Sequence, residues 1–339
     1  MPSNSLLKSA LLAIIITFVA VSYWEIHLKQ NGIKPDYDNG AELWTNKRKM
    51  VYEPSSKSTV ILGSSRGAYD IDIPTYERMT GKRAIQLCMD GSSPRTVFDD
   101  LANDPKFKGK VILDVTEMLF FNNIPFMLST PAENLTYYKK ETPAQKVSFA
   151  LDVPLEANLV FLNQSFFSLN PLLNLLHIKD RPGYRPELDF PRDFNVTDFD
   201  RQNRMTDKFL IDTSLQNRVR GIWLMVNGML PPPIKGKEFA ANLQNIKENV
   251  TKIRKRGGDV IFIRTPSSGP VAAIEAKVFP KSEYWDKLLA VTGCKGIHYT
   301  DYPALSNFVC PEFSHLSPRD AMVYTEHLVT ILKTDKNWN

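Results

Sequence analysis

The sequence has few of the residues that mark disulfide-rich or metal-binding proteins. It contains three cysteines and five histidines among 339 residues, and so few cysteines fit an oxidising compartment only loosely. Asp90, Asp114, Glu117 and Asp301 are expected near strand ends, but their spacing is not that of a cation-binding motif. Structural capping is therefore the preferred interpretation of these carboxylates, and neither a metal nor another cofactor is predicted.

An excess of one charge is also missing. The 42 basic and 37 acidic side chains leave a net charge of +5, and the densest basic run is KIRKR at 252–256. A run of this kind at the end of an amphipathic helix is typical of a solvated last turn, so no nucleic-acid partner is predicted. With 43% hydrophobic and 23% charged residues the chain is expected to be globular.

One long apolar run stands near the N-terminus. The 19 residues from Leu6 to Trp24 contain a single charge, Lys8, and end in Tyr23 and Trp24, an aromatic pair typical of a membrane interface. Such a run is just long enough to cross a bilayer core, which needs about 20 helical residues. A signal peptide cleaved after the small residues before Tyr23 is the alternative. An uncleaved, single-pass anchor is favoured, and with either segment the rest of the chain is expected to be exported, to the periplasm or the cell exterior.

The cysteines leave two interpretations open. Cys294 and Cys310 lie 16 positions apart near the end of the chain and can pair if their loops meet. Cys88 follows an apolar run and is expected to be buried. Three unpaired thiols remain the alternative.

Short apolar runs alternate with helical patterns in two separate parts of the chain, which predicts a mostly parallel sheet. Strands are expected at Thr59–Gly63, Ala84–Met89, Lys110–Val115 and Asp259–Pro266, with a short last strand within Gly296–Pro303. Phe239, Leu243, Ile246, Val250 and Ile253 form one apolar face of a helix between the third and fourth strands. The fold predicted is a three-layer α/β sandwich.

A segment without this alternation separates the two parts. It is rich in Phe, Leu, Asn and Pro, and is expected to be a mostly helical insertion packed on the sheet. The alternatives are that its apolar residues cover the active site, contact a partner or lie on a membrane surface. The sequence is therefore divided into an anchor (1–28), a stalk (29–58), a first half of the α/β domain (59–119), the insertion (120–234) and a second half (235–339).

The first strand runs into Gly63-Ser64-Ser65. In an open parallel sheet ligands bind outside the carboxyl ends of the strands, where a serine after this turn is expected. Gly-Ser-Ser is also a common loop composition, and a serine there can simply cap the next helix.

The C-terminal part supplies a partner for this serine. His315 lies in a polar loop two residues before Ser317, the expected N-cap of the last helix, and Glu312 lies three residues before the histidine. A serine nucleophile needs a base, and the base needs a carboxylate that fixes its tautomer. The helix N-terminus is expected to keep His315 neutral.

Together these motifs resemble the SGNH (GDSL-type) hydrolase superfamily. A Gly-x-Ser turn after the first strand, a glycine after the second and an acidic-x-x-His motif before the last helix carry the resemblance. Within it the chain is most similar to the membrane-anchored, exported branch of DltD-like and alginate O-acetylation proteins. The resemblance covers about 59–114 and 260–332 and implies a flavodoxin-like sheet. It places the nucleophile at Ser65, the oxyanion glycine at Gly91, the base at His315 and the acidic residue at Glu312.

Two features depart from the superfamily's pattern. Glu312 stands where it has an aspartate, and LDVTEM stands where it has Gly-x-Asn-Asp after the third strand, so that Thr116 or Glu117 replaces an asparagine oxyanion donor. The oxyanion hole, the set of donors that binds the negatively charged oxygen of the reaction intermediate, is then expected to depend on the backbone N–H groups of Ser65 and Gly91. Arg66 or Asn122 is expected as a further donor. Arg264, after the fourth strand, is a candidate for substrate binding, or for pairing with a nearby carboxylate.

Two functions follow as expectations. The first is a serine acyltransferase or esterase, with acetyl as the expected acyl group, that acts on a cell-envelope polysaccharide or glycolipid beside a membrane-bound O-acyltransferase. The second is a non-catalytic accessory protein of the same fold that binds such a membrane partner or a polysaccharide. The complete set of Ser65, Glu312 and His315 favours the first, and the altered third block favours the second.

Overall fold

The structure is a computed structural model that describes residues 4–173, 176, 188 and 190–338. The chain forms two compact units. Residues 1–38 and 143–185 make up a helical unit, and residues 39–142 and 186–339 make up an α/β unit. The chain therefore passes between the two units three times, and each unit is described by itself.

A five-stranded parallel sheet forms the centre of the α/β unit. Its strands are β1 (Ser58–Leu62), β2 (Arg83–Gln86), β3 (Lys110–Asp114), β6 (Asp259–Arg264) and β7 (Lys295–His298). They lie in the order β2-β1-β3-β6-β7, with Val60 of β1 opposite Ile85 of β2 and Val111 of β3. This is the doubly wound order whose direction reverses between β1 and β3, the place where such sheets bind ligands.

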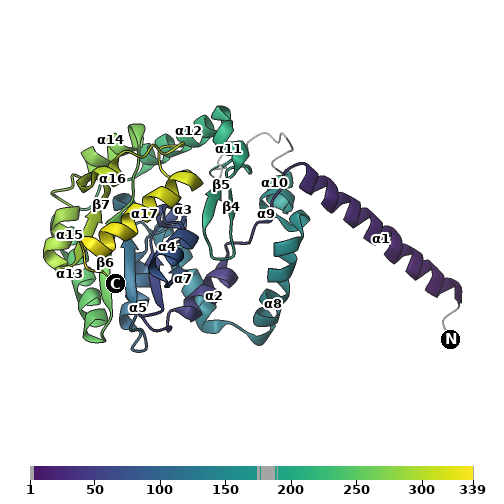
Figure 1. The fold of residues 1–339 in the computed structure, drawn as a ribbon, viewed down its shortest axis with the longest axis horizontal. Coiled ribbons are helices and arrows are strands. Elements are labelled where there is room, and N and C mark those ends of the chain that lie inside the picture. Colours follow the sequence, from purple (N-terminus) through teal and green to yellow (C-terminus); the bar gives the residue numbers. More distant parts are fainter. Residues whose placement is uncertain (1–3, 174–175, 177–187, 189, 339) are drawn as a thin grey trace. The chain divides into compact units, whose positions relative to one another are not determined.

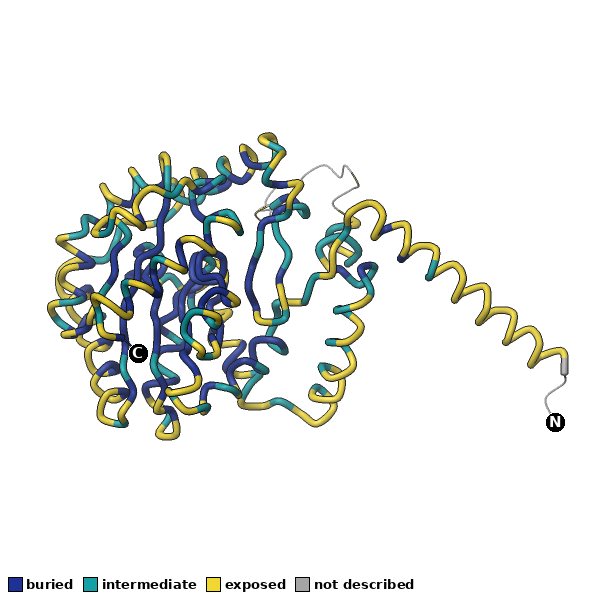
Figure 2. The backbone as a smooth tube through the Cα atoms, in the orientation of Figure 1, coloured by how far each residue is buried: buried dark blue, intermediate teal, exposed yellow. Residues whose placement is uncertain are grey.

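Helices cover both faces of this sheet, which gives the three layers that the sequence predicts (Figure 1). Val60 and Leu62 point into one apolar core and Ile61 into the other. Helices over the first face are α5 (Arg95–Asn103), α13 (Gly236–Lys255) and α15 (Trp285–Thr292). Helices over the second face are α3 (Ser65–Asp70), α4 (Ile73–Thr80), α16 (Pro303–Ser306) and α17 (Pro318–Thr334). Figure 2 shows the strands as the most buried part of the chain, which explains their continuous apolar composition.

The helices begin and end at residues that the local sequence favours. The side chain of Asp72 accepts a hydrogen bond from the Thr75 N–H at the start of α4, and Gly81 ends that helix at φ +67°. Ser317 caps α17 by accepting from the Asp320 N–H. The predicted apolar face of α13 is also confirmed, because all five of its residues are buried.

The segment expected as a stalk contains a helix, α2 (Ala41–Met50), that belongs to the core. Trp44 is fully buried, and its indole N–H donates to the Leu87 carbonyl at 3.3 Å. Arg48 is also buried and pairs with Asp100 at 2.8 Å and Asp104 at 3.1 Å. Both acidic partners lie more than 50 residues away, so no local pattern marks this helix as part of the domain.

The predicted insertion is divided between the two units. Its first and last parts belong to the α/β unit and residues 143–185 belong to the helical unit. The α/β unit also contains α6 (Glu117–Phe120), α7 (Pro125–Lys140), the antiparallel pair β4 (Asn195–Thr197) and β5 (Asn203–Met205), α11 (Asp207–Ile211), α12 (Thr213–Met229) and α14 (Gly269–Val278). Residues 174–175, 177–187 and 189 of the insertion lie outside the described residues.

The helical unit contains the apolar N-terminal run. Its elements are α1 (Asn4–Gln30), α8 (Pro143–Asn158), the 3-10 turn η1 (Val160–Leu162), α9 (Gln164–Phe167) and α10 (Leu169–Leu173). The part of α1 from Ser5 to Gln30 is long and apolar enough to cross a membrane. Figure 2 shows α1 exposed along most of its length.

The predicted pairing of Cys294 with Cys310 is wrong. Both thiols are free and buried, as is Cys88. Cys294 packs in the core on one face of the sheet and Cys310 in the core on the other. The sheet therefore lies between the two residues, and a disulfide cannot form without unfolding this part of the domain.

Candidate active site

The turn after β1 presents two serines in different ways. Ser64 is buried, and its hydroxyl is 2.8 Å from the hydroxyl of Thr116, so it holds the turn to the end of β3. Ser65 is the first residue of α3 and is half-buried, the most accessible position of the stretch from Gly63 to Asp70. This placement agrees with the expectation that Ser65, and not Ser64, faces the site.

Two glycines make the turn sterically feasible. A Cβ on Gly63 would lie 2.9 Å from the Asp114 Cβ, and a Cβ on Gly67 would lie 2.6 Å from the Cys88 sulfur. The backbone therefore packs directly against the ends of β2 and β3. Sequence reasoning missed Gly67, although the spacing Gly-x-Ser-x-Gly is a known signal for a sharp strand-to-helix turn that exposes a serine.

Ser65, His315 and Glu312 form one hydrogen-bonded chain. The Ser65 hydroxyl is 2.8 Å from His315 Nε2. His315 Nδ1 is 3.0 Å from Glu312 Oε1 on the other side of the ring. Serine and histidine are 250 positions apart in sequence, and the parallel sheet places the loops that carry them at the same edge. Both distances lie in the range needed for proton transfer and for fixing the ring.

Glu312 is buried and held by three donors. Oε1 accepts from the backbone N–H of His315 at 2.6 Å as well as from the ring. Oε2 accepts from the indole N–H of Trp223 on α12. Sequence reasoning missed Trp223, which is 89 positions from Glu312 in a segment without a recognisable motif.

The His315 ring is buried among aromatic rings. It stacks on Tyr69 of α3 at a centroid distance of 4.4 Å, and Trp223 packs edge-on at 5.6 Å. Burial of the ring lowers the pKa of His315, but the charge and hydrogen bond of Glu312 outweigh burial and raise the pKa above its usual value. The expected neutralising effect of the helix N-terminus is therefore overcome, because the carboxylate is in direct contact with the ring.

Two buried carboxyl groups lie near the triad. Asp70 Oδ1 accepts from the Leu316 N–H at 2.8 Å, next to His315, and Asp114 Oδ1 accepts from the Thr265 N–H at 3.4 Å. Burial raises the pKa of Asp70 to about 7 and that of Asp114 to about 6. The second oxygen of each carboxyl is buried and has no hydrogen-bond partner among the residues that the structure describes.

The two predicted substrate-binding arginines belong to a buried charge network. Arg66 pairs with Glu275 of α14 at 2.5 Å and donates to Ser314 at 3.3 Å. Arg264 pairs with the same Glu275 at 2.5 Å and with Glu117 at 3.0 Å. The structure thus brings the arginines together over Glu275, and the alternative that Arg264 pairs with a carboxylate holds. Arg264 balances the negative charge of Glu117, which lies in the altered third block.

Gly91 and Asn122 differ in their accessibility. Gly91 lies in an exposed turn after β2 with φ +60°. Asn122 is buried: its amide donates to the Met118 carbonyl at 2.8 Å, and Arg95 donates to its backbone carbonyl. Asn122 therefore stabilises the turn after α6, which leaves Gly91 as the exposed oxyanion candidate of the two.

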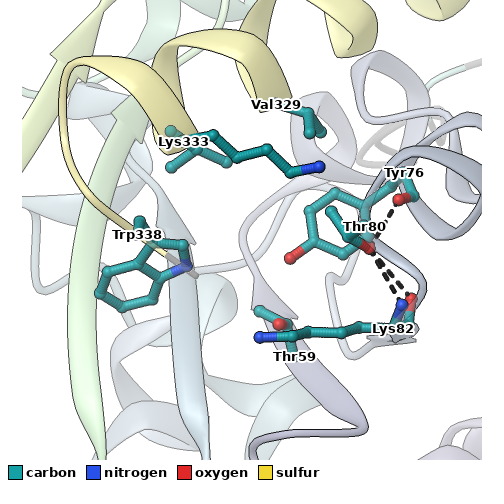
Figure 3. A pocket seen from close by; sticks show the side chains of 8 residues that line it. Thr59, Tyr76, Thr80, Lys82, Val329, Lys333 and Trp338 are labelled. Carbon is teal, nitrogen blue, oxygen red and sulfur yellow. Dashed lines mark hydrogen bonds between the residues drawn. The ribbon is translucent and has the colours of Figure 1, made fainter.

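A small pocket elsewhere on the domain is not part of this site (Figure 3). It has a volume of about 220 Å³ and is lined from β1, α4 and α17. Thr59 and Lys82 lie at the amino ends of their strands, the opposite edge from Ser65. Within the part of the chain that the structure describes, His, Cys, Asp and Glu side chains form no group of three suited to a metal ion.

Comparison with known proteins gives no match to a family and none to a curated protein. Any assignment of function must therefore rest on the geometry of the site.

Proposed function

We propose that the protein is a membrane-anchored, exported serine acyltransferase or esterase of the SGNH type. The observation that carries this proposal is the continuous contact from Ser65 through His315 to Glu312. In this mechanism His315 Nε2 removes the Ser65 proton as the hydroxyl oxygen attacks an ester carbonyl. The imidazolium then gives that proton to the departing alcohol, and an acyl ester remains on Ser65.

A second half-reaction regenerates the serine. His315 removes a proton from a water molecule or from a sugar hydroxyl, whose oxygen attacks the acyl carbon, and Ser65 leaves with that proton. Water as acceptor makes the protein an esterase, and a sugar hydroxyl makes it a transferase. Glu312 keeps the ring in the required tautomer and stabilises the imidazolium in both halves.

The architecture supports the superfamily resemblance at a coarser level. The parallel α/β sheet, the serine after β1 and the histidine before α17 are the features that support this proposal. The oxyanion is assigned to the backbone N–H groups of Ser65 and Gly91, because Arg66, Arg264 and Asn122 are bound to other partners. Loss of a side-chain donor typically costs about 3–4 kcal/mol of barrier, so slow chemistry is expected.

The substrate class follows from the N-terminal helix. An anchored domain on the exported side meets polymers and lipids of the cell envelope, so a polysaccharide or glycolipid is the proposed acceptor. A membrane-bound O-acyltransferase is the proposed partner that supplies the acyl group, with acetyl as the expected group.

A non-catalytic accessory role is the second candidate. The observation that favours it is the third block, where Thr116 is bonded to Ser64 and Glu117 to Arg264, so that neither is a donor for an oxyanion. In that role the same domain would bind the membrane partner or the polysaccharide.

Reaction with a fluorophosphonate distinguishes the two candidates. We expect the full chain to gain the mass of one phosphonyl group, mapped to Ser65 by peptide sequencing, and the Ser65→Ala variant to gain none. A Ser64→Ala variant is the matched control, since its hydroxyl is buried and should not react. Absence of an adduct from the folded wild-type chain would favour the accessory role.

A further inference from the structure

The outward side of α8 is apolar, the reverse of an ordinary surface helix. Its large exposed side chains recur every four residues: Val147, Leu151 and Leu155, exposed by 60%, 60% and 45%. The acidic residues Asp152 and Glu156 are half-buried instead, and Glu156 accepts from the Asp38 N–H at 3.4 Å inside the helical unit. A helix that turns its carboxylates inward and its aliphatic side chains outward is suited to an apolar neighbour.

Helix α10, which follows η1 and α9 in the chain, also exposes apolar side chains. In α10 and just after it, four leucines are exposed: Leu169, Leu172, Leu173 and Leu176. We call these four residues, together with Val147, Leu151 and Leu155, the leucine surface. Single exposed aliphatic side chains are ordinary, but seven within the 30 residues from 147 to 176 mark an interaction surface.

The segment between these helices is fixed to the end of α1. The Glu25 carboxylate accepts from the N–H groups of Val160 and Phe161 at 2.9 and 3.2 Å. The Lys29 ammonium donates to the Asn158 carbonyl at 2.9 Å. The last turns of α1 therefore hold η1, to which α8 is joined on one side and α9 and α10 on the other.

The position of Glu25 sets the depth of this junction. A bilayer core of about 30 Å takes about 20 helical residues, which counted back from Trp24 reach Ser5. Tyr23 and Trp24 then lie at the interface, where such rings are favoured, and Glu25 is the first residue beyond it. Trp24 also packs edge-on against Phe167, the last residue of α9, at a ring-centroid distance of 6.5 Å, so the end of α9 lies at the level of the lipid headgroups.

We propose that the leucine surface lies on the same phospholipid leaflet from which α1 emerges, as a second, in-plane membrane contact. The side chains would enter the boundary between headgroups and acyl chains, about 5–10 Å deep, as amphipathic interfacial helices do. This inference rests on the membrane anchor of the proposed function, but not on the chemistry of Ser65.

Single-cysteine labelling of the full chain tests the contact. Leu151→Cys and Leu172→Cys would each carry an environment-sensitive fluorophore, and Lys247→Cys on the exposed side of α13 would be the control. The three natural cysteines are buried, so labelled wild-type chain gives the background. The variants would be reconstituted in vesicles of phosphatidylcholine and phosphatidylglycerol, with and without nitroxide-labelled lipid.

We expect a blue-shifted emission and strong quenching by the nitroxide lipid at positions 151 and 172, and neither effect at position 247. If the protein floats with the vesicles but the probes at 151 and 172 behave like the one at 247, the lipid contact is overturned and the anchor is not. If the chain does not float, the anchor and the contact both fail. Fluorophosphonate labelling of Ser65 in the same samples reports on the chemistry independently, and its absence would leave the lipid contact intact.

Discussion

Glu312 combines three hydrogen bonds in a fully buried position, from the ring and the backbone N–H of His315 and from the Trp223 indole. An aspartate side chain is one methylene shorter and would not span the same gap from the same backbone position. The indole partner thus explains how a glutamate is accommodated in this place. Trp223 donates to Oε2 and His315 donates to Oε1, so both carboxylate oxygens of Glu312 act as acceptors.

Replacing Glu312 with Gln removes the charge that raises the pKa of His315. The glutamine side chain also has an NH₂ group in place of one oxygen, so one of the acceptors for His315 and Trp223 is lost. We expect the rate of Ser65 phosphonylation to fall by about 10²–10⁴-fold. The midpoint of the pH–rate profile should also move to lower pH, since the imidazolium is less stabilised. Stopped reactions followed by intact mass between pH 5 and 9 measure both effects.

Glu312→Asp is the matched control, because it keeps the charge and should keep more of the raised midpoint. An unchanged midpoint in Glu312→Gln would mean that the carboxylate does not set the protonation of His315.

Asp70 provides a prediction for stability. Its pKa is raised by burial to about 7 in the folded chain, above the value of about 4 expected after unfolding. The folded state therefore binds more protons between these two values, and the free energy of unfolding that Asp70 contributes declines as the pH rises through that window. Asp70→Asn keeps an acceptor for the Leu316 N–H and carries no charge.

We expect Asp70→Asn to be more stable than wild type at pH 8, by an amount on the order of 1–4 kcal/mol, and the difference to shrink towards pH 4. Urea unfolding of both chains at a series of pH values measures this. A difference that does not vary with pH would show that Asp70 does not titrate in this range.

At the scale of the element, the turn from β1 into α3 depends on two close backbone contacts. The Gly67→Ala change places a Cβ 2.6 Å from the sulfur of Cys88, which is itself buried in the core. Overpacking of this kind typically costs about 1–3 kcal/mol. The melting temperature should fall accordingly, and Ser65 phosphonylation should slow because the serine begins the same helix.

Gly221→Ala in α12 is the matched control. Among the described residues, a Cβ there meets no atom within 4 Å apart from its chain neighbours and the backbone of its own helix, so the change should stabilise the helix by about 0.5–1 kcal/mol. A double variant in which Cys88→Ala accompanies Gly67→Ala should regain part of the loss, since the clashing sulfur is gone. If the double variant is no more stable than Gly67→Ala alone, the clash with the Cys88 sulfur is not the cause of the loss.

The sequence predicts those elements whose pattern is local. The strands are short apolar runs buried on both faces, and α13 repeats its buried residues at helical spacing. Pairings that join distant residues leave no such pattern. Arg48 in α2 is buried only because Asp100 and Asp104 neutralise it, and Trp223 belongs to the site only because folding places α12 beside the loop of Glu312.

The same distinction separates the predicted site residues. Ser65, Glu312 and His315 lie in turns with recognisable capping and glycine patterns, and they do come together. Arg66 and Arg264 lie at strand ends like ligand-binding residues, but Glu275, which binds both, stands on a helix without any motif. The sequence alone does not reveal that their charges are already matched.

For the whole molecule, the N-terminal helix α1 leads to a prediction about membrane attachment. We expect the full chain to remain in the membrane pellet after carbonate extraction, because α1 exposes an apolar surface that is long enough to cross a bilayer. A chain that begins at Tyr23 keeps Glu25 and Leu28, which pack in the helical unit. It should fold and react with fluorophosphonate, and carbonate should release it. Release of the full chain, or a mature N-terminus at Tyr23, would contradict the anchor.

The network of Arg66, Glu117, Arg264 and Glu275 has a consequence for evolution. Removal of one member leaves an uncompensated buried charge, which typically costs 3–5 kcal/mol, whereas replacing a whole buried ion network by apolar residues is often neutral. Descendants of one ancestor should therefore retain all four residues or exchange them together. A pattern of four positions spread over more than 200 residues is rarely met by chance, and it offers a signature by which distant relatives of this chain can be recognised.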